Sequence, residues 1–386
     1  MINFNGNIVE SPTFTADNRG VLYGDGVFET MRYSGDKIYF WEEHYLRLMA
    51  SMRIMRMDIP MGFTMEKLEE EVIKCLTANG LAQASARVRL TVYRNDGGTY
   101  LPQDNGVGYF ISAKALQNPF FTLDDETYEV ELYKDHYLSA DLLSTIKSTN
   151  RLINITGSIF ADENGYQNCL LLNNNKMVVE ALNGNVFLVK GNTLKTPPLA
   201  DGCLRGIIRK QVLDILGKVE DFEVEEASIS PFELQKADEV FITNSILGIR
   251  PVTKYRKKSF NTGVARKLAT AVGARHVAMH LDKNAISARL IEGVLQLPVQ
   301  EPLVVRLDRD LLSRVDTSVQ LGIHAVYESN ESLSSSSDTA ISRGRPVSAV
   351  RRGTQRHRRG GVRGGGGAVF FVGFCVSLVQ RQRVPR

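Results

Sequence analysis

The sequence predicts a two-domain protein whose fold combines the α+β and α/β classes. In the first 118 residues, segments with helical spacing of apolar side chains lie among segments with strand-like alternation, and over residues 124–272 short strands and hairpin turns dominate. At 386 residues the chain is long enough for two domains with separate cores. We therefore expect a small α+β domain over 1–118, a linker over 119–123 and a larger, β-rich α/β domain over 124–272.

Two helices and two long strands are predicted in the small domain. The segment KIYFWEEHYLRLMASMRIM has apolar spacing near 3.6 from Trp41 onward, and TMEKLEEEVIKCLTANG opens at Thr64, has early acidic residues and ends in Gly80. ARVRLTVYR, residues 86–94, alternates polar and apolar residues and is expected to be a strand. GVGYFISAKAL is its expected partner across the turn NDGGTYLPQDN.

The second block alternates short strands with turn signals. Strands are expected in YEVELYKD, NCLLLNNNKMVVEA, NVFLVKGNTLKTP and around EVFITNSILGIRPVTKY, with NNNK and KGN as turns. GIIRKQVLDILG is expected to be a helix. We expect this domain to end near residue 272.

The composition changes over residues 273–386. Lys is absent after Lys283, and runs of Ser, Arg and Gly follow, as in SLSSSSDTAISRGRPVSAVRRG. The final apolar run AVFFVGFCVSLV has only 12 residues, which is too short to span a bilayer. We expect 273–386 to be a disordered or non-native extension without a catalytic role; the alternative is a basic tail that touches nucleic acid or a membrane.

The net charge of +4 is unevenly distributed along the chain. Residues 343–386 contain 11 Arg and no acidic residue, so residues 1–342 carry 36 basic and 43 acidic side chains. A protein that binds a phosphate backbone needs its basic surplus on the folded part. No nucleic acid is therefore expected as a partner of the folded body.

The cysteines and the N-terminus indicate the compartment. Cys75, Cys169, Cys203 and Cys375 lie far apart and form no Cys-x-x-Cys pair, so no metal site or redox couple is expected. The start MINFNGNIVES lacks the basic and apolar regions of a secretory signal. We expect a cytoplasmic protein without a membrane segment.

The segment DLLSTIKSTNRLINI contains the first candidate for chemistry. Lys147 has hydroxyl and amide side chains around it and no acidic residue within five positions. A free Lys has a pKa of about 10.4 and becomes a useful nucleophile only when burial or a nearby positive charge lowers that value. Taken alone, Lys147 is more often a surface lysine than one that forms a Schiff base.

Two further segments complement this lysine. Glu180 stands at the end of a strand-like run, where it would either pair with a protonated ring nitrogen or simply end the strand. PPLADGCLRGIIRKQVLDIL places Gly202 and Gly206 before a helix. The free amides and the dipole at such a helix start form an anion site suited to phosphate, although many such starts are only turns.

Six motifs, in order, resemble the class IV aminotransferase family of fold-type IV pyridoxal-phosphate enzymes. They are NRGVLYGDGVFETMR, HYLRL, IKSTNRL, EALNGNVF, LRGIIR and ITNS, and they cover residues 1 to about 270. The family includes branched-chain and D-amino-acid aminotransferases and 4-amino-4-deoxychorismate lyase. The resemblance implies a fold like that of D-amino-acid aminotransferase, pyridoxal 5′-phosphate as cofactor and a homodimer with the active site near the subunit interface.

The resemblance also implies a role for particular residues. Lys147 is similar to the residue that forms an imine with the cofactor and then moves a proton between substrate and cofactor, and Glu180 to the carboxylate that keeps the pyridine nitrogen protonated. The residues similar to the family's phosphate ligands are Arg47, the backbone amides of Ile207 and Ile208, and the hydroxyl of Thr243.

Substrate contacts are expected mainly from the small domain. Arg94 in VYRNDGGTY and Arg32 in FETMR are candidates for binding a carboxylate, and surface or structural arginines are the alternative. Tyr23 and Phe28 are candidates for lining the pocket, with core packing as their alternative. Asn244 in ITNS is a further expected substrate contact.

Three functions follow as hypotheses. The first is amino transfer between an amino acid and a 2-oxo acid through Lys147. The second is a lyase that releases pyruvate and 4-aminobenzoate from aminodeoxychorismate, because RNDGGTYL resembles the Gly-rich loop of the lyases. The Lys-x-x-Asn form of KSTN is similar to both the lyase and the D-amino-acid members. The third is a non-enzymatic scaffold whose basic tail binds nucleic acid.

Overall fold

The fold is described from a computed structural model. It describes residues 1–118, 121–123, 126–218, 221–278, 304–305 and 370–371. The chain divides into two compact units, Met1–Glu301 and Pro302–Arg386. In the second unit, β17 (Val304–Val305) pairs antiparallel with β18 (Phe370–Phe371). The other residues of the tail after 278, for which disorder is predicted, lie outside the described residues. Everything below concerns the first unit.

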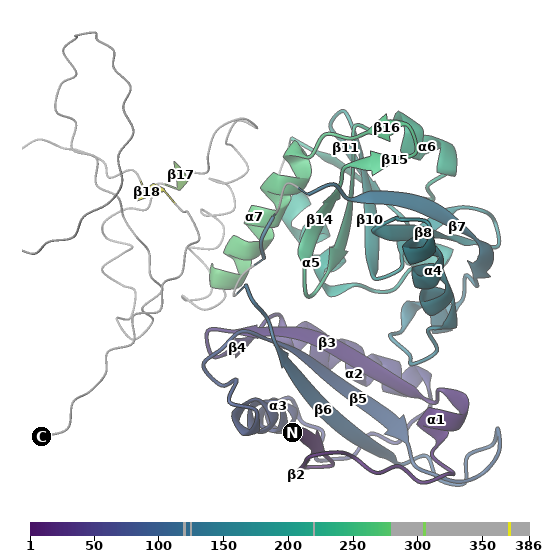
Figure 1. Cartoon of the computed structure of the whole chain (residues 1–386), viewed down its shortest axis with the longest axis vertical. Helices are drawn as coiled ribbons and strands as arrows, with labels where there is room; N and C mark the ends of the chain where they lie inside the picture. The colour runs from purple at the N-terminus through teal and green to yellow at the C-terminus, as the bar shows by residue number, and fades with distance from the viewer. Residues whose placement is uncertain (119–120, 124–125, 219–220, 279–303, 306–369, 372–386) are drawn as a thin grey trace, which may run out of the picture. The chain divides into compact units, whose positions relative to one another are not determined.

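A six-stranded antiparallel sheet forms within residues 1–118, which we call the small lobe (Figure 1). Its strand order is β2-β1-β6-β5-β3-β4. The strands are β1 (Ile2–Phe4), β2 (Asn7–Val9), β3 (Gly26–Ser34), β4 (Lys37–Ile38), β5 (Ala86–Arg94) and β6 (Val107–Ala115). The predicted strand at 86–94 and its pairing with β6 are confirmed.

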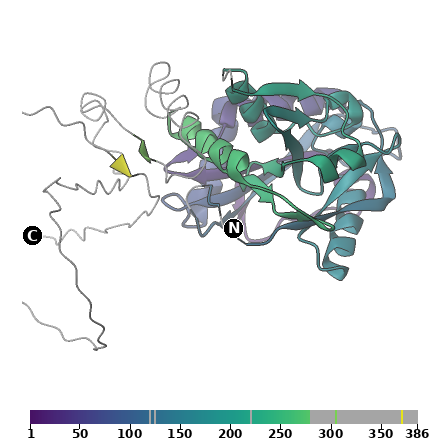
Figure 2. The ribbon, with the colours of Figure 1, turned by 90° about the horizontal axis from the view of Figure 1, so that it is seen from above.

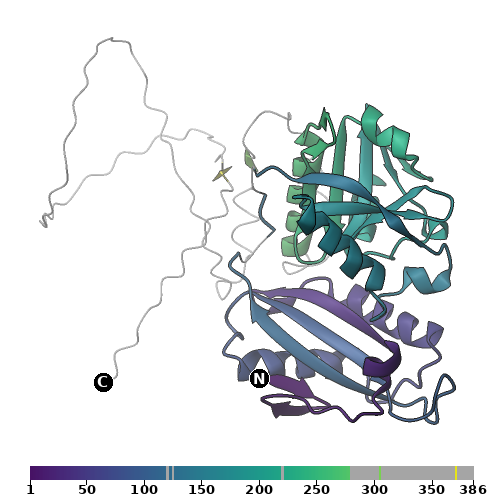
Figure 3. The same cartoon turned by 45° about the vertical axis from the view of Figure 1, so that its right-hand side comes forward.

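Two long helices lie on one face of this sheet (Figures 1 and 3). They are α2 (Trp41–Ile54) and α3 (Met65–Ala78), at the predicted positions, and a short helix α1 (Arg19–Tyr23) precedes β3. The Thr64 hydroxyl caps α3 by accepting from the amide of Lys67. Side chains of both helices and of alternate strand positions form the buried core, so the opposite strand positions face away from it.

A ten-stranded mixed sheet forms within residues 126–278, which we call the large lobe. The path is β12-β11-β10-β9-β8-β7-β15-β16, and β13 pairs with β10 and β14. The strands are β7 (Glu129–Leu138), β8 (Asn168–Asn173), β9 (Val178–Ala181), β10 (Gly184–Lys190), β11 (Thr193–Thr196), β12 (Glu223–Glu226), β13 (Glu239–Asn244), β14 (Gly248–Val252), β15 (Lys254–Tyr255) and β16 (Lys258–Ser259). The division into two lobes remains our proposal.

The large lobe contains several helices that the sequence pattern does not predict. They are η1 (Leu142–Thr145), α4 (Leu152–Glu163), η2 (Leu199–Asp201), α5 (Ile207–Leu216), α6 (Pro231–Lys236) and α7 (Gly263–Ala278). Helix α5 lies at the predicted position, whereas α4, α6 and α7 are unpredicted. Helix α4 carries β-branched residues and a Gly of weak helix propensity. Helix α7 packs against β14 and α5 (Figure 2), and it runs across residue 272. The helix therefore continues past residue 272, where we expect the domain to end.

No helix in the described part of the chain is both long and apolar enough to cross a membrane. The described cysteines, Cys75, Cys169 and Cys203, are all buried and free.

Candidate active site

A cavity of about 460 Å³ is lined by residues of both lobes. The small lobe contributes side chains of β3, β5 and α2, and the large lobe contributes the segment before α4, the β9–β10 turn, the start of α5 and the end of β13. The residues predicted to act on a cofactor all line it; they are Arg47, Lys147, Glu180, Ile207, Ile208 and Thr243.

Lys147 is half-buried and lies between η1 and α4. Its carbonyl accepts a hydrogen bond from the amide of Phe28 at 2.8 Å, and its amine nitrogen is 4.7 Å from the centre of the Phe28 ring. Burial, with the positive charges of Arg47 and Arg151, lowers the pKa of Lys147 to about 7. A large fraction of such an amine is uncharged near neutral pH, so it can act as a nucleophile and carry a proton.

Glu180 of β9 is 5% exposed. Its Oε2 accepts a hydrogen bond from the amide of Leu204 at 2.8 Å. Burial raises the pKa of the Glu180 carboxyl, although the charge of Arg151 and the Leu204 amide act in the opposite direction. A cationic group bound in the cavity would favour the ionised carboxylate.

Arg47 of α2 is held by a buried carboxylate of β3. Its Nε and Nη2 donate to the two carboxylate oxygens of Glu29 at 2.8 and 2.5 Å, and the Nδ1 of His44 lies 2.6 Å from the same carboxylate. Burial alone would raise the pKa of Glu29, but Arg47 and His44 lower it to about 2. The Nη1 of Arg47 donates to the carbonyl of Arg205 at 2.8 Å. This bidentate pair fixes the guanidinium beside the start of α5.

The start of α5 is suited to an anion. The first amides of a helix have no acceptor earlier in the helix and carry the positive end of its dipole, which places Ile207 and Ile208 as donors. Gly206, the residue before α5, has no room for a side chain, because a Cβ there would lie 1.9 Å from the Oδ1 of Asn185. The hydroxyl oxygen of Thr243 is buried and has no hydrogen-bond partner among the described residues. A buried polar atom of this kind indicates a missing ligand or water.

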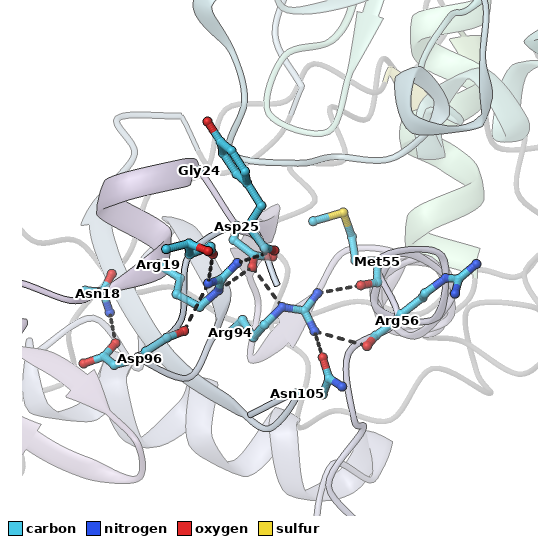
Figure 4. A network of polar contacts seen from close by, with 12 residues as sticks. Asn18, Arg19, Gly24, Asp25, Met55, Arg56, Arg94, Asp96 and Asn105 are labelled. Carbon is cyan, nitrogen blue, oxygen red and sulfur yellow. Dashed lines mark hydrogen bonds and ion pairs between the residues drawn. The ribbon is translucent and has the colours of Figure 1, made fainter. Parts of the chain in front are cut away.

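The structure does not place Arg94 at the cavity. Its Nε donates to Asp25 at 2.9 Å, its Nη1 to Asn105 and the Arg56 carbonyl, and its Nη2 to the Met55 carbonyl (Figure 4). Arg94 shares strand parity with the apolar residues of β5, so it points to the helix side of the sheet. The predicted substrate role is therefore corrected to a structural one.

Arg32 is also committed to backbone acceptors. Its Nε and Nη2 donate to the Ile246 carbonyl at 3.2 and 2.8 Å, and its Nη1 donates to the Asn118 carbonyl at 2.6 Å. Ile246 lines the cavity but Arg32 does not, so Arg32 supports the cavity wall. The expected direct contact with a substrate carboxylate is not retained.

The remaining substrate candidates differ in position. Tyr23 ends α1 and does not line the cavity; its ring centre is 5.8 Å from that of Tyr100. Asn244 and Phe28 do line the cavity. The side-chain oxygen of Asn244 accepts from the amide of Leu247 at 2.8 Å, so it also shapes the turn after β13.

Three arginines that line the cavity are missing from the sequence-based set: Arg151, which precedes α4, and the pair Arg87 and Arg89. Both lie on β5, and the register that pairs Arg89 with Thr30 of β3 puts them on the strand face turned away from the helices. The guanidinium carbon of Arg89 is 3.8 Å from the centre of the Phe28 ring. The alternation in ARVRLTVYR could have identified them. Arg87 and Arg89 occupy the positions between the apolar residues, whereas Arg94 lies on the same strand face as the apolar residues.

The fold and the cavity define an enzyme-like site that combines a reactive amine, a buried carboxylate and an anion cradle. Residues 26–255 match the family described as amino-transferase class IV. The chain belongs to this class IV aminotransferase family, so the predicted family and fold type are confirmed.

Relatives and solved structures agree. A putative branched-chain-amino-acid aminotransferase of Methanocaldococcus jannaschii is 34% identical over 236 residues, covering 61% of this chain and 80% of that protein. An aminodeoxychorismate lyase of Vibrio harveyi is 26% identical over 238 residues, covering 61% and 85%. The branched-chain aminotransferase of Thermoproteus uzoniensis, solved with norvaline, superposes with a TM-score of 0.64 at 27% identity, covering 72% of this chain and 94% of that one.

Proposed function

We propose that this protein binds pyridoxal 5′-phosphate and transfers an amino group between an amino acid and a 2-oxo acid. The observation that carries the proposal is the Lys147 amine, with its pKa lowered to about 7, in one cavity with Glu180 and the anion cradle. The cofactor fits these residues, because the buried, unpartnered Thr243 hydroxyl and the free amides at the start of α5 suit its phosphate.

The phosphate would be held at one end of the cavity. Arg47 would contribute a charge fixed by Glu29, the amides of Ile207 and Ile208 would donate hydrogen bonds, and the Thr243 hydroxyl would gain an acceptor. Arg47 belongs to the small lobe and the other donors to the large lobe, so a bound phosphate would connect the two lobes.

The chemistry would occur at the other end. When bound, the cofactor supplies an aldehyde that accepts an amino group and a ring that withdraws electrons. Glu180 would keep the ring nitrogen protonated through an ion pair in a buried environment. Lys147 would hold the cofactor covalently and, when released by the substrate amine, remove the proton from the substrate Cα.

The lyase remains the second candidate function. The lyase of Vibrio harveyi is a relative, although it is less identical to this chain than the aminotransferase of Methanocaldococcus jannaschii. Lys147 would serve either reaction, because both begin with proton removal at the substrate Cα. Membership of an enzyme family argues against the third hypothesis, a non-enzymatic scaffold.

One paired assay tests the proposal. The purified protein with pyridoxal phosphate is incubated with 2-oxoglutarate and candidate amino acids, and in parallel with aminodeoxychorismate. Glutamate without 4-aminobenzoate supports amino transfer, and 4-aminobenzoate without glutamate establishes the lyase. If neither product forms and no cofactor absorption band develops, the proposed function is wrong.

Arg87 and Arg89 are proposed to bind a carboxylate on the substrate side chain. Among the described ion pairs neither guanidinium has a carboxylate partner, and burial, followed by repulsion from Arg87 and Arg151, lowers the pKa of Arg89. A second carboxylate would relieve this repulsion. We therefore expect the pocket to prefer dicarboxylic substrates such as glutamate and 2-oxoglutarate.

Replacing Arg87 and Arg89 with Gln is expected to lower the ratio of kcat/KM for dicarboxylic over monocarboxylic substrates by about 10- to 100-fold. Steady-state kinetics with a matched series of amino acids measures this ratio. Arg94→Gln is the control: it should lower the free energy of unfolding by about 3–5 kcal/mol, because it breaks a buried ion pair, and leave the ratio unchanged. An unchanged ratio in the double variant would refute the assignment.

A homodimer is proposed from an exposed apolar face on α4. Leu152, Ile155 and Ile159 are 76%, 54% and 53% exposed and share one side of the helix, next to the Lys147 segment. Ile155→Asp is expected to convert a dimer to a monomer in sedimentation at micromolar concentration. Met61→Asp is the control, since Met61 is a fully exposed apolar residue of the small lobe. A wild-type monomer, or a dimer that survives Ile155→Asp, would contradict this interface.

A cytoplasmic location is also proposed. The buried free thiols of Cys75, Cys169 and Cys203 support it, because thiols persist in a reducing compartment. Fractionation of cells that produce the full chain would test it.

A further inference from the structure

We propose that Thr149 and Asp25 are positioning residues that set the place of the Lys147 amine by tying its segment to the N-terminal end of β3. The inference rests on the proposed role of Lys147 as the reactive amine. It assigns a function to two groups that do not line the cavity.

The Lys147 segment is hydrogen-bonded to the start of β3 on both sides of the antiparallel bridge between Val27 and Ser148. The amide of Phe28 donates to the Lys147 carbonyl at 2.8 Å, and the amide of Thr149 donates to the Gly26 carbonyl at 2.9 Å. The Thr149 hydroxyl donates to the carbonyl of Gly24 at 2.6 Å and lies 3.2 Å from that of Gly26. The segment therefore extends the edge of the small-lobe sheet for a few residues.

Because of this attachment, the backbone of Lys147 is held by a different lobe from the one that carries Glu180 and Thr243. Glu180, Thr243 and the start of α5 are built on the large-lobe sheet and its helix, whereas the backbone of Lys147 is fastened to the small lobe. The distance between the amine and those groups therefore depends on how firmly residues 147–149 are held at Gly24 and Gly26.

Asp25, which precedes β3, is itself held by two arginines. The Nε atoms of Arg19 and Arg94 both lie 2.9 Å from the Oδ2 of Asp25, and Figure 4 shows the two guanidinium groups meeting there. Arg19 also donates to the carbonyls of Gly97 and Thr99. Both arginines are buried, so their charges strongly favour a fixed carboxylate at this position. Gly24 and Gly26, the acceptors for Thr149, flank this anchored residue.

The charges around the amine make its position measurable. Burial lowers the pKa of Lys147 most, and the positive charges of Arg47 and Arg151 lower it further. The carboxylates of Glu29 and Glu180 act in the opposite direction. If residues 147–149 detach from β3, the amine gains water, and its pKa moves up toward the ordinary value of 10.5.

The first experiment measures acetylation of Lys147 against pH. The full-length protein, freed of bound aldehyde with hydroxylamine, reacts with trace acetic anhydride, and peptide mass spectrometry follows Lys147. Thr149→Val keeps the side-chain shape and removes the hydroxyl, Thr149→Ser keeps the hydroxyl, and Thr156→Val is the control in α4. Thr156 donates to the Leu152 carbonyl within its own helix.

Thr149→Val is expected to raise the midpoint of acetylation above about 7 by one pH unit or more, which lowers the rate at pH 7 by about fivefold. Thr149→Ser and Thr156→Val should stay within about twofold of the wild type. A Thr149→Val protein that is less stable but has an unchanged midpoint would overturn the proposal. Because no cofactor takes part, this failure is distinct from a failure of the proposed function.

The second experiment tests Asp25 and needs no titration. Hydrogen–deuterium exchange of the full chain compares Asp25→Asn with Asp96→Asn, a carboxylate of the same network that accepts from Thr15 and Asn18 but does not contact residues 24–28. Faster exchange in peptides covering 24–28 and 147–150 is expected for Asp25→Asn alone. Unchanged exchange at 147–150, or equal changes in both variants, would overturn the role of Asp25.

Discussion

Lys147→Ala is expected to lower kcat/KM for the proposed amino transfer on the order of 10⁴-fold, because it removes both the covalent attachment and the proton carrier. The absorption band of the covalently bound cofactor should be lost in the same protein. Steady-state kinetics and absorption spectra of wild type and variant, each with added pyridoxal phosphate, measure the two effects. Lys190→Ala, which removes an exposed lysine paired with Asp238, should retain both properties.

The stability of the Lys147→Ala variant relative to wild type is expected to depend on pH in a predictable direction. Folding lowers the pKa of Lys147 from 10.5 to about 7, so the folded state binds its proton less well than the unfolded chain. The contribution of Lys147 to stability is therefore most unfavourable below pH 7 and improves as the pH rises from 7 toward 10.5. Lys147→Ala should be at least as stable as wild type at pH 6 in denaturant unfolding. Loss of stability at pH 6, or retention of activity, would contradict the assignment.

Glu180→Gln is expected to lower kcat by about 10²- to 10³-fold, because an amide cannot stabilise a positively charged ring nitrogen as a carboxylate does. The phosphate donors remain, so the affinity for pyridoxal phosphate should fall much less than kcat. Single-turnover kinetics and cofactor titration separate these quantities.

Glu239→Gln provides the matched control for Glu180. Glu239 is also buried in the large lobe, but its carboxylate accepts from the amides of Val264 and Ala265 at the start of α7 and does not line the cavity. Its replacement should reduce stability with little effect on kcat. Equal kinetic losses in the two variants would show that Glu180 acts through the fold and not on the ring.

Much of the fold follows from local patterns. The spacing from Trp41 and the Thr64 cap predicted α2 and α3, and the alternation over 86–94 predicted β5, because each of these elements has one apolar and one polar face. Helices α4, α6 and α7 were missed; in α4, Leu152, Ile155 and Ile159 are exposed and the weak helix formers do not favour a helix locally. The domain end near residue 272 stays a prediction, and α7 continues beyond it to Ala278.

The site was predicted unevenly. Ordered motifs identified the six residues that meet in the cavity, whereas Arg94 and Arg32 were selected for their residue type and their place in a motif. The alternation along β5 shows which arginines share a strand face. Which of the two faces turns toward the cavity is decided only when the helices cover the other one. That is why Arg87 and Arg89, and not Arg94, reach the cavity.

The order of residues alone determined the family, the amine of Lys147 and the groups that would accompany it. Only the tertiary structure decided that this amine is fastened to the small lobe, while the Glu180 carboxylate, the Thr243 hydroxyl and the start of α5 belong to the large lobe. The physical reason is that hydrogen bonds such as that between Thr149 and Gly24 join positions 125 residues apart. Burial and neighbouring charge, which lower the pKa of Lys147, likewise exist only after the two lobes meet around it.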